Sequence, residues 1–397
     1  MPGGGALDVQ PVFDWLVDGA RGCNLPQDVL RELCGRLAAV GCTLNRASVF
    51  VLTLHPIVAG RSFQWRAGSD EIHVGQMSYE VMASETFTNS PVSAIYKSRA
   101  EFRRRLADAS CALDFPLLEQ LRNEGTTDYL GLPLEFTDGA VHVVVFDTKQ
   151  PGGFSAGEVD GLRRVRAPLA RVAEAYALRR TARSLIDAFL GHQVGQRVLS
   201  GQVKRGDGED IHAVIWFCDL RDSTPLAESM SRRDYLAMLN DYFDCIAGAV
   251  LDGQGEVLRY IGDAVLAIFP VAQPADPASV RAACALAVAA AKDALGRMAA
   301  LNAGRAANGA PPLGFGIGLH LGDVMYGNIG TPTRIEFTVI GAAANEAARI
   351  ESLCKTLGVS LLMSDRVARH LDGTWASLGK RALKGVGSEI EVFTLAS

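Results

Sequence analysis

The sequence predicts an α+β protein with two domains joined by a long helix. Segments that alternate apolar and polar residues, typical of half-buried strands, interchange along the chain with segments of helical spacing. The chain has 397 residues, 48% of them hydrophobic, which is enough for two or three domains with their own cores. We expect a first α+β domain over 1–154, a helix and linker over 155–204, and a second α+β domain over 205–397.

Composition argues against several classes of protein. The net charge of −5 gives no general attraction for nucleic acid or acidic membranes. The eight cysteines form no C-x-x-C pair, so a zinc ribbon or redox motif is not expected, and scattered free thiols suit a reducing cytoplasm. The N-terminus lacks a secretory pattern, and the most apolar stretch, 278–295, contains three charged residues. We therefore expect a cytoplasmic protein with no membrane span and no nucleic-acid partner.

The first domain is predicted from one helix and four strands. The helix covers 27–41 and ends at a glycine, and Asp138-Gly139 marks a hairpin turn between the last two strands. The expected strands cover residues 47–54, 62–68, 128–136 and 140–148.

A single long helix is predicted over residues 155–190. Ser155 is a candidate N-cap, and Glu158 completes a capping box with it. Two interpretations stay open, because Pro168 interrupts a short apolar repeat. The helix either packs on its own domain or forms a short parallel coiled coil that carries a signal between domains. The polar, glycine-rich segment 200–210 is a predicted linker.

The second domain alternates strands with helices. Helices are expected near residues 231–251, 278–303 and 342–357. Strands are expected over residues 212–220, 256–262, 264–270, 313–322 and 334–341.

Two acidic residues lie where these strands end. Asp219 ends the first strand, before a turn with Ser223 and Thr224 that leads into a helix, and Asp263 lies in the hairpin turn Gly262-Asp263. Loop amides can hold phosphate oxygens, and carboxylates at strand ends suit a hard cation such as Mg²⁺. An N-cap aspartate and a turn aspartate would be the purely structural alternative.

A third feature favours the functional interpretation. Asn345 and Arg349 are four residues apart, so they share one face of the last predicted helix. Asparagine is a poor helix former, and the pair stands in an alanine-rich segment, which suggests that both side chains point outward to a ligand. A solvated helix face is the alternative.

Five ordered segments together resemble the catalytic domain of class III adenylate and guanylate cyclases. They extend over roughly 190 residues, about half the chain, and occur in the order found in that family. In the sequence they read FCDLRDST, RYIGDAVLAIF, GIGLHLGDVMYGNIG, TVIGAAANEAARIE and LKGVGSEIEVFTL. The order of elements in residues 1–154 resembles small-ligand sensor domains of the GAF type.

The cyclase resemblance implies a ferredoxin-like α+β fold, paired head to tail as a homodimer with shared active sites. It implies that Asp219, Leu220 and Asp263 of one protomer hold two Mg²⁺ or Mn²⁺ ions. Asn345 and Arg349 of the other protomer would then orient the ribose of ATP and stabilise charge at the α-phosphate. The expected activity is adenylate cyclase, a phosphorus-oxygen lyase that forms 3′,5′-cyclic AMP and pyrophosphate.

Residues at the base and phosphate positions depart from the commonest pattern. The resemblance places Arg259 where adenylate cyclases usually have lysine, and Thr338 where one cAMP-forming subclass has threonine or serine. It also places Gly316 where many relatives have an arginine for the terminal phosphates, a charge that Lys384 could supply. Adenine is favoured, and Ser223, Thr224, Arg259, Thr338 and Lys384 are the expected substrate-binding residues.

Two other functions are weighed against this one. Guanylate cyclase activity would use the same chemistry with different base recognition, and a non-catalytic nucleotide-binding regulator would normally lack a metal aspartate or the Asn/Arg pair. The first domain is expected to sense an unknown small molecule or protein signal, or to serve only in dimerisation. Its histidines His55, His73 and His142 are too scattered to predict a metal site.

Overall fold

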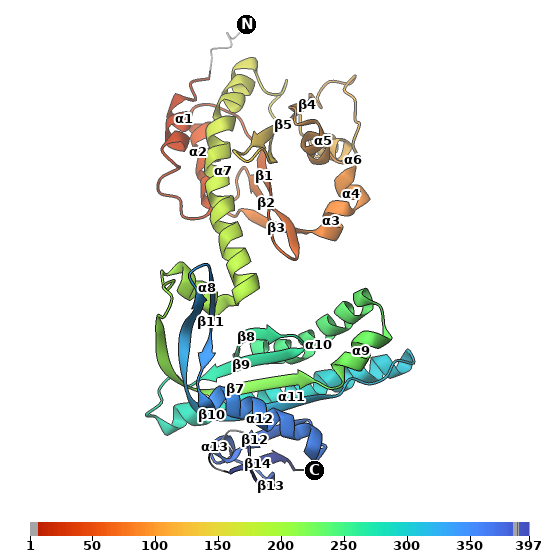
Figure 1. The fold of residues 1–397 in the computed structure, drawn as a ribbon. Helices are drawn as coiled ribbons and strands as arrows, with labels where there is room; N and C mark the ends of the chain where they lie inside the picture. Colours follow the sequence, from red (N-terminus) through yellow and green to blue (C-terminus); the bar gives the residue numbers. More distant parts are fainter. Residues whose placement is uncertain (1–6, 384–386, 388, 397) are drawn as a thin grey trace. The chain divides into compact units, whose positions relative to one another are not determined.

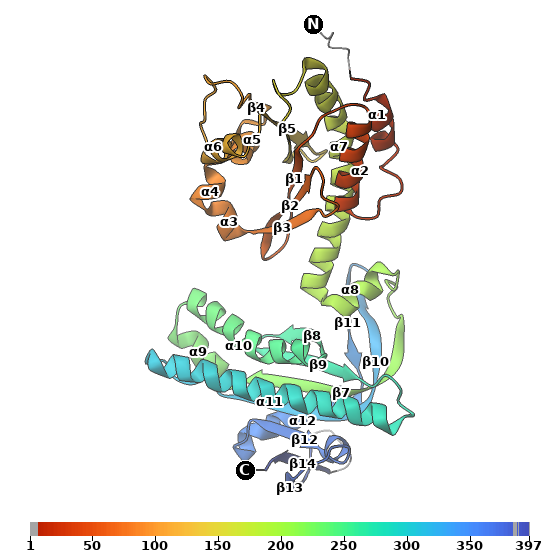
Figure 2. The ribbon, with the colours of Figure 1, turned by 180° about the vertical axis from the view of Figure 1, so that it is seen from behind.

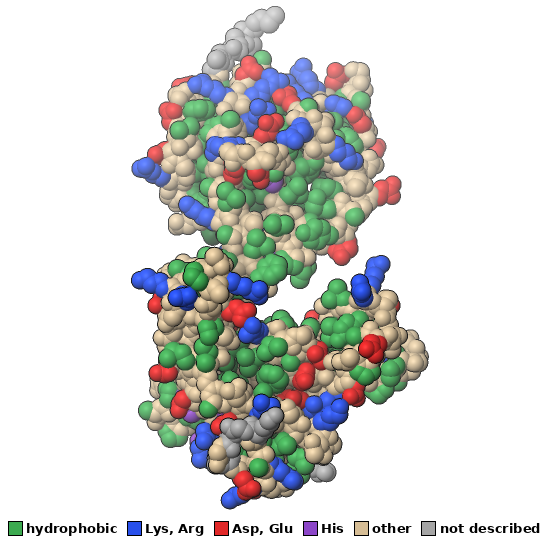
Figure 3. All heavy atoms as spheres, viewed as in Figure 1, with side chains coloured by type: hydrophobic (Ala, Val, Ile, Leu, Met, Phe, Trp, Pro, Cys, Tyr) green, Lys and Arg blue, Asp and Glu red, His purple; other side chains and the backbone are tan. Residues whose placement is uncertain are grey.

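The computed structural model describes residues 7–383, 387 and 389–396. The chain divides into two compact units, Met1–Ala188 and Phe189–Ser397, and each is described separately (Figure 1). No helix in the described ranges is both long enough and apolar enough to cross a bilayer. On the face seen in Figure 3, basic and acidic side chains are interspersed on each unit.

A six-stranded antiparallel sheet forms the centre of the first unit, in the order β3-β2-β1-β6-β5-β4. Helices α1, α2 and α7 lie on one side of this sheet and α3 to α6 on the other (Figures 1 and 2). The sequence missed the short strands β3 and β4, which pair only at the two edges of the sheet. The strands are β1 (Arg46–Leu52), β2 (Val58–Arg66), β3 (His73–Ser78), β4 (Phe102–Arg104), β5 (Asp128–Glu135) and β6 (Val141–Thr148). The helices are α1 (Gln10–Val17), α2 (Pro26–Ala39), α3 (Tyr79–Ala83), α4 (Glu85–Thr88), α5 (Pro91–Ser98), α6 (Pro116–Asn123) and α7 (Ala156–Leu190).

The predicted hairpin and helix start are both present. Strands β5 and β6 form the antiparallel hairpin around Asp138-Gly139, where Gly139 has a φ of 85°. The Ser155 hydroxyl accepts a hydrogen bond from the Glu158 amide at 3.2 Å, and the Glu158 carboxylate accepts one from the Ser155 amide at 2.8 Å. This reciprocal capping box starts α7, which continues through the buried Pro168.

The second unit has an eight-stranded sheet in the order β13-β14-β12-β10-β7-β9-β8, with β11 also paired to β10. Strands β10, β7, β9 and β8 are antiparallel neighbours, with α10 after β7 and α11 after β9, which is the ferredoxin-like arrangement. The strands are β7 (Gly208–Leu220), β8 (Glu256–Ile261), β9 (Ala264–Pro270), β10 (Phe315–Thr331), β11 (Arg334–Ile340), β12 (Leu361–Ser364), β13 (Trp375–Arg381) and β14 (Ile390–Leu395). The helices are α8 (His192–Leu199), α9 (Ser223–Ser229), α10 (Arg232–Asp252), α11 (Pro277–Ala307), α12 (Ala342–Leu357) and α13 (Asp365–Ala368).

Two segments differ from the sequence-based expectation. Strand β7 begins at Gly208, inside the predicted linker, because Gly208–Ile211 pair with Val324–Gly327. Strand β10 runs on to Thr331, since its second half pairs with both β7 and β11. These segments are rich in polar residues and glycine, so their local sequence pattern does not predict strands.

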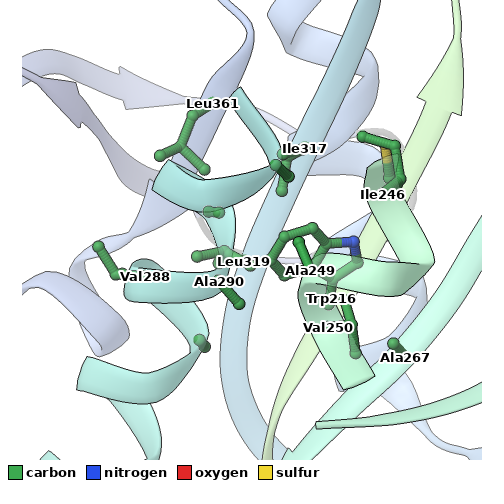
Figure 4. Packing of buried hydrophobic residues seen from close by; sticks show 14 of the residues in the cluster. Trp216, Ile246, Ala249, Val250, Ala267, Val288, Ala290, Ile317, Leu319 and Leu361 are labelled. Carbon is green, nitrogen blue, oxygen red and sulfur yellow. The ribbon is translucent and has the colours of Figure 1, made fainter. Parts of the chain in front are cut away.

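Helices cover both faces of the second sheet. Helices α10 and α11 bury one face in a core that contains Trp216 of β7, and Figure 4 shows side chains of these helices and of the strands packed around its indole. A smaller core on the other face includes Ala213 and Ile215 of β7 together with Ala343 and Ala347 of α12. Successive residues of β7 therefore face the two cores in turn. Asp219 is an even number of residues from Ala213 and Ile215, so its side chain lies on the same face of the sheet as α12.

Candidate functional site

The structure brings the two predicted carboxylates together. Asp219 is the penultimate residue of β7, and Asp263 lies in the turn between β8 and β9. Because β9 pairs with β7, that turn lies beside the end of β7. The two carboxyl groups are in hydrogen-bonding contact, and burial, reinforced by the neighbouring Asp263, raises the pKa of Asp219 above its usual value.

This pair fits a hard divalent cation. Two half-buried carboxylates in contact repel one another when ionised, and a cation between them would relieve that repulsion. In the part of the chain that the structure describes, no group of three or more His, Cys, Asp or Glu side chains is placed to hold a metal. Mg²⁺ is ordinarily held by one or two carboxylates, with water and substrate phosphates at the other positions. The donor set therefore suits a cation that binds together with a nucleotide.

The residues after Asp219 form the predicted turn. Leu220 is buried and ends β7, and Asp222 has a left-handed backbone, with φ of 53° and ψ of 35°. Ser223 and Thr224 then begin α9, so both lie one short turn from the carboxylate pair. Lys384, the fifth expected substrate-binding residue, lies outside the described residues.

An ion pair beside the carboxylates escaped the sequence analysis. The Arg221 guanidinium lies 2.7 Å from the Glu351 carboxylate of α12, and the Arg221 charge favours ionisation of Asp219. Burial raises the pKa of Glu351 to about 7, against the opposing effect of Arg221. A Cβ at Gly316 would collide with both charged groups.

The glycine at 316 therefore leaves the room that the Arg221 side chain fills. Gly316 of β10 is the register partner of Asp219 of β7. The Arg221 guanidinium, which fills the space above Gly316, therefore lies beside the carboxylate pair. The sequence offered one clue to this ion pair. Arg221 follows closely after Asp219, and Gly316 stands where the resemblance predicts an arginine.

Arg259 and Thr338 come from neighbouring strands. Arg259 of β8 makes an ion pair of 2.7 Å with Glu336 of β11, and both side chains are partly exposed. Thr338 lies two residues beyond Glu336, so the two side chains share one face of β11. Thr338 itself is 6% exposed. The structure thus places the Arg259 guanidinium against the strand and face that carry Thr338.

Asn345 and Arg349 lie on the opposite face of α12 from the sheet. The buried face of this helix contains Ala343, Ala347 and Ile350, roughly half a turn away from the exposed pair. In the described residues neither side chain has a hydrogen-bond or ion-pair partner. Helix α12 packs on β10 and β7, so this pair points away from the strand that carries Asp219 in the same copy.

Three comparisons relate this chain to known proteins, and the family model places its match in the second unit. Residues 209–397 match the family model described as "Adenylate and Guanylate cyclase catalytic domain". An adenylate cyclase of Anabaena cylindrica is 36% identical over 159 residues, which are 40% of this chain and 30% of that protein. Adenylate cyclase 1 of Rhizobium meliloti is 30% identical over 179 residues, which are 45% of this chain and 26% of that protein. The chain thus matches less than a third of the length of these two relatives.

A solved structure is similar to about half of this chain. The crystal structure of the adenylyl cyclase CyaB from P. aeruginosa aligns with a TM-score of 0.42 and 24% identity. The alignment covers 48% of this chain and 96% of that one.

Proposed function

We propose that this chain, whose residues 209–397 are a class III adenylate and guanylate cyclase catalytic domain, converts ATP into 3′,5′-cyclic AMP and pyrophosphate at sites shared by two copies. One observation carries the proposal. The Asp219–Asp263 carboxyl pair lies at one end of the sheet, while the Asn345–Arg349 pair, which has no polar partner among the described residues, faces away from that sheet.

The carboxylate pair supplies the cation site. Asp219 and Asp263, with Leu220 beside them, would hold two Mg²⁺ or Mn²⁺ ions. The Arg221 charge favours the ionised form of Asp219, against burial and the neighbouring Asp263, which raise its pKa. Bound cations there would lower the pKa of the ribose 3′-hydroxyl and offset the charge of the triphosphate. Ser223 and Thr224, which begin α9, would bind phosphate oxygens.

The second copy supplies the remaining groups. The Asn345 amide would orient the ribose, and the Arg349 guanidinium would balance the charge that develops on the α-phosphate. A single copy turns these side chains away from its own carboxylate pair, so a partner with the opposite orientation brings both halves of the site together.

Exposed large apolar residues on three strands of the second unit support the homodimer. Isolated exposed apolar residues are ordinary, whereas a group on adjoining strands is typical of a protein interface. The exposed large apolar residues of β8, β10 and β11 are Tyr260, Ile261, Met325, Ile329, Ile335 and Ile340.

Base recognition is assigned to Arg259 and Thr338. The Arg259 guanidinium is a donor for a ring nitrogen of adenine, and the Thr338 hydroxyl can donate or accept a hydrogen bond. Guanylate cyclase activity is the second candidate, because the Glu336 carboxylate is paired with Arg259 and could accept hydrogen bonds from guanine. The resemblance to the threonine-type subclass favours adenine.

The first unit is proposed to regulate the cyclase. Its sheet, covered by helices on both sides, is compatible with a GAF-like sensor domain that responds to a small molecule or protein. The long helix α7 continues from it and is the proposed connection to the cyclase domain.

The test is a turnover assay on the purified chain. ATP and GTP are supplied separately with Mg²⁺ or Mn²⁺, and cyclic nucleotide and pyrophosphate are both quantified. We expect cyclic AMP as the main product and loss of that product on chelation. A matched Asp219→Asn variant should lose activity, and product formation by this variant at the wild-type rate would contradict the site assignment. Binding of ATP without any cyclic product would instead indicate a non-catalytic regulator.

A further inference from the structure

The first unit contains an apolar cavity between α2, the sheet and α7, and Figure 1 shows these two helices on the same side of the sheet. The cavity has a volume of about 60 Å³. Apolar side chains of all three elements form its wall, among them Leu30, Val49, Phe63 and Leu169. A cavity of this size and lining takes a slim hydrocarbon group, such as an unbranched chain or one ring.

Two arginines line this otherwise apolar space. Arg61 comes from β2 and Arg180 from α7, and both contribute to the cavity wall. Burial, with a further contribution from the Arg180 charge, lowers the pKa of Arg61. Neither guanidinium has an ion-pair or hydrogen-bond partner in the described residues. Two neighbouring cations without an acid are unfavourable, and an anion between them would remove that cost.

A polar recess continues from the cavity and shares Thr53, Arg61 and Arg180 with it. The recess is completed by residues that include His55, Thr181 and Ser184. The Nδ1 atom of His55 accepts hydrogen bonds from the amides of two following residues at 3.1 Å, so the neutral ring carries its proton on Nε2. The recess therefore offers donors beside the two arginines.

We propose that this cavity binds a free carboxylic acid with a slim hydrocarbon body. The carboxylate lies between Arg61 and Arg180, and the hydrocarbon extends between α2, the sheet and α7. This orientation of the ligand follows from the residues that line the space, which are apolar on one side of the two arginines and polar on the other. The inference goes beyond the proposed cyclase activity and does not depend on it.

An acidic side chain from a second copy is the competing occupant. Aspartate and glutamate carry at most two methylene groups, which would satisfy the arginines but leave the apolar space unfilled. An acid with a longer hydrocarbon uses both parts, so affinity should rise with chain length until the cavity is full.

The experiment is calorimetric titration of the full chain with hexanoate, octanoate and decanoate, and with decanol as the neutral counterpart. We expect decanoate to bind more tightly than hexanoate, and about tenfold or more tightly than decanol, because two charged hydrogen-bond donors meet the carboxylate. Arg61→Gln and Arg180→Gln should each weaken decanoate binding about tenfold and leave decanol binding unchanged.

Two further variants keep the test decisive. Ala173→Leu fills the cavity from α7 and should abolish binding of decanoate while both arginines remain. Arg183→Gln removes an exposed arginine of the same helix that does not line the cavity, and it should leave binding unchanged. Equal affinity for decanoate and decanol, or decanoate binding that survives Ala173→Leu, would overturn the proposal. Absence of acid binding together with self-association that Arg61→Gln disrupts would identify the second copy as the occupant.

Discussion

The Arg259 guanidinium lies 2.7 Å from the Glu336 carboxylate, and the two residues come from strands β8 and β11. Two roles are open to Arg259: the base-reading side chain that the resemblance implies, and one half of a cross-strand ion pair. The ion pair is present, yet it lies on the face of β11 that also carries Thr338. An exposed pair of this kind contributes about 0–1 kcal/mol to folding, so its position is more informative than its energy.

The variant Arg259→Ala separates the two roles. Loss of a base-reading donor should raise the KM for ATP about tenfold and erode discrimination against GTP, with a change in unfolding free energy of about 1 kcal/mol or less. Steady-state kinetics with both nucleotides and thermal unfolding provide the measurements.

The variant Glu336→Gln is the control, because it removes the ion pair and keeps Arg259. ATP kinetics close to wild type in this variant would support a direct role for the guanidinium. If Arg259→Ala left both the KM and the nucleotide preference unchanged, base selection would fall to Thr338 and the other pocket residues.

His142 gives a pH prediction for the first unit. Its Nδ1 accepts a hydrogen bond from the Leu52 amide at 3.0 Å, and burial lowers the pKa of the ring to about 4. The unfolded chain therefore binds this proton more readily, so folding stability falls as the pH is lowered from 6.5 towards 4. This loss of unfolding free energy reaches about 3 kcal/mol at pH 4.

Proton NMR of the histidine ring can follow this titration directly, with the resonance assigned by its loss in His142→Gln. The unfolding free energy of that variant should depend less steeply on pH between 6.5 and 4 than that of the wild type. A ring pKa near 6.5 in the folded protein would contradict the prediction.

At the scale of the elements, the placement of α12 depends on a glycine in β10. A Cβ on Gly318 would lie 2.5 Å from the Ala347 carbonyl oxygen and 2.5 Å from the Glu351 amide nitrogen. Both atoms belong to the helix backbone, which cannot rotate away as a side chain could. The close packing of helix on strand also fixes the helix that carries Asn345 and Arg349.

Gly318→Ala should therefore destabilise the second unit by about 2 kcal/mol or more, because α12 must move away from the sheet. Gly296→Ala is the matched control. That exposed glycine lies inside α11 with open space around its Cβ position, so alanine should stabilise the helix by about 0.5–1 kcal/mol. Denaturant unfolding of both variants provides the comparison, and equal stabilities would show that α12 adapts to the extra methyl group.

At the scale of the whole molecule, mixing two inactive variants tests whether the site is shared. If the proposed site is shared by two copies, Asp219→Asn and Asn345→Ala should each be inactive alone, because each homodimer would lack one half of every site. After subunit exchange or co-expression, one site in each mixed dimer has both halves intact, and random pairing should restore about a quarter of wild-type activity. Absence of recovery in dimers verified to be mixed would place the complete site within one copy.

The sequence by itself determined the parts of this protein that depend on local patterns. Strand alternation and helical spacing predicted most of the elements around the site, and the capping box and the Asp138-Gly139 turn followed from residues close together in the chain. Asp219 and Asp263 were identified because each ends a strand, which is a local property that the sequence displays.

The tertiary structure alone decided which distant groups meet. No local pattern pairs Arg221 with Glu351, because the space between them exists only where Gly316 of a third element leaves out a side chain. Arg61 and Arg180 likewise line one cavity only because β2 and α7 pack around it. Such contacts depend on the packing of segments far apart in sequence, whereas periodicity and turn chemistry report only on neighbouring residues.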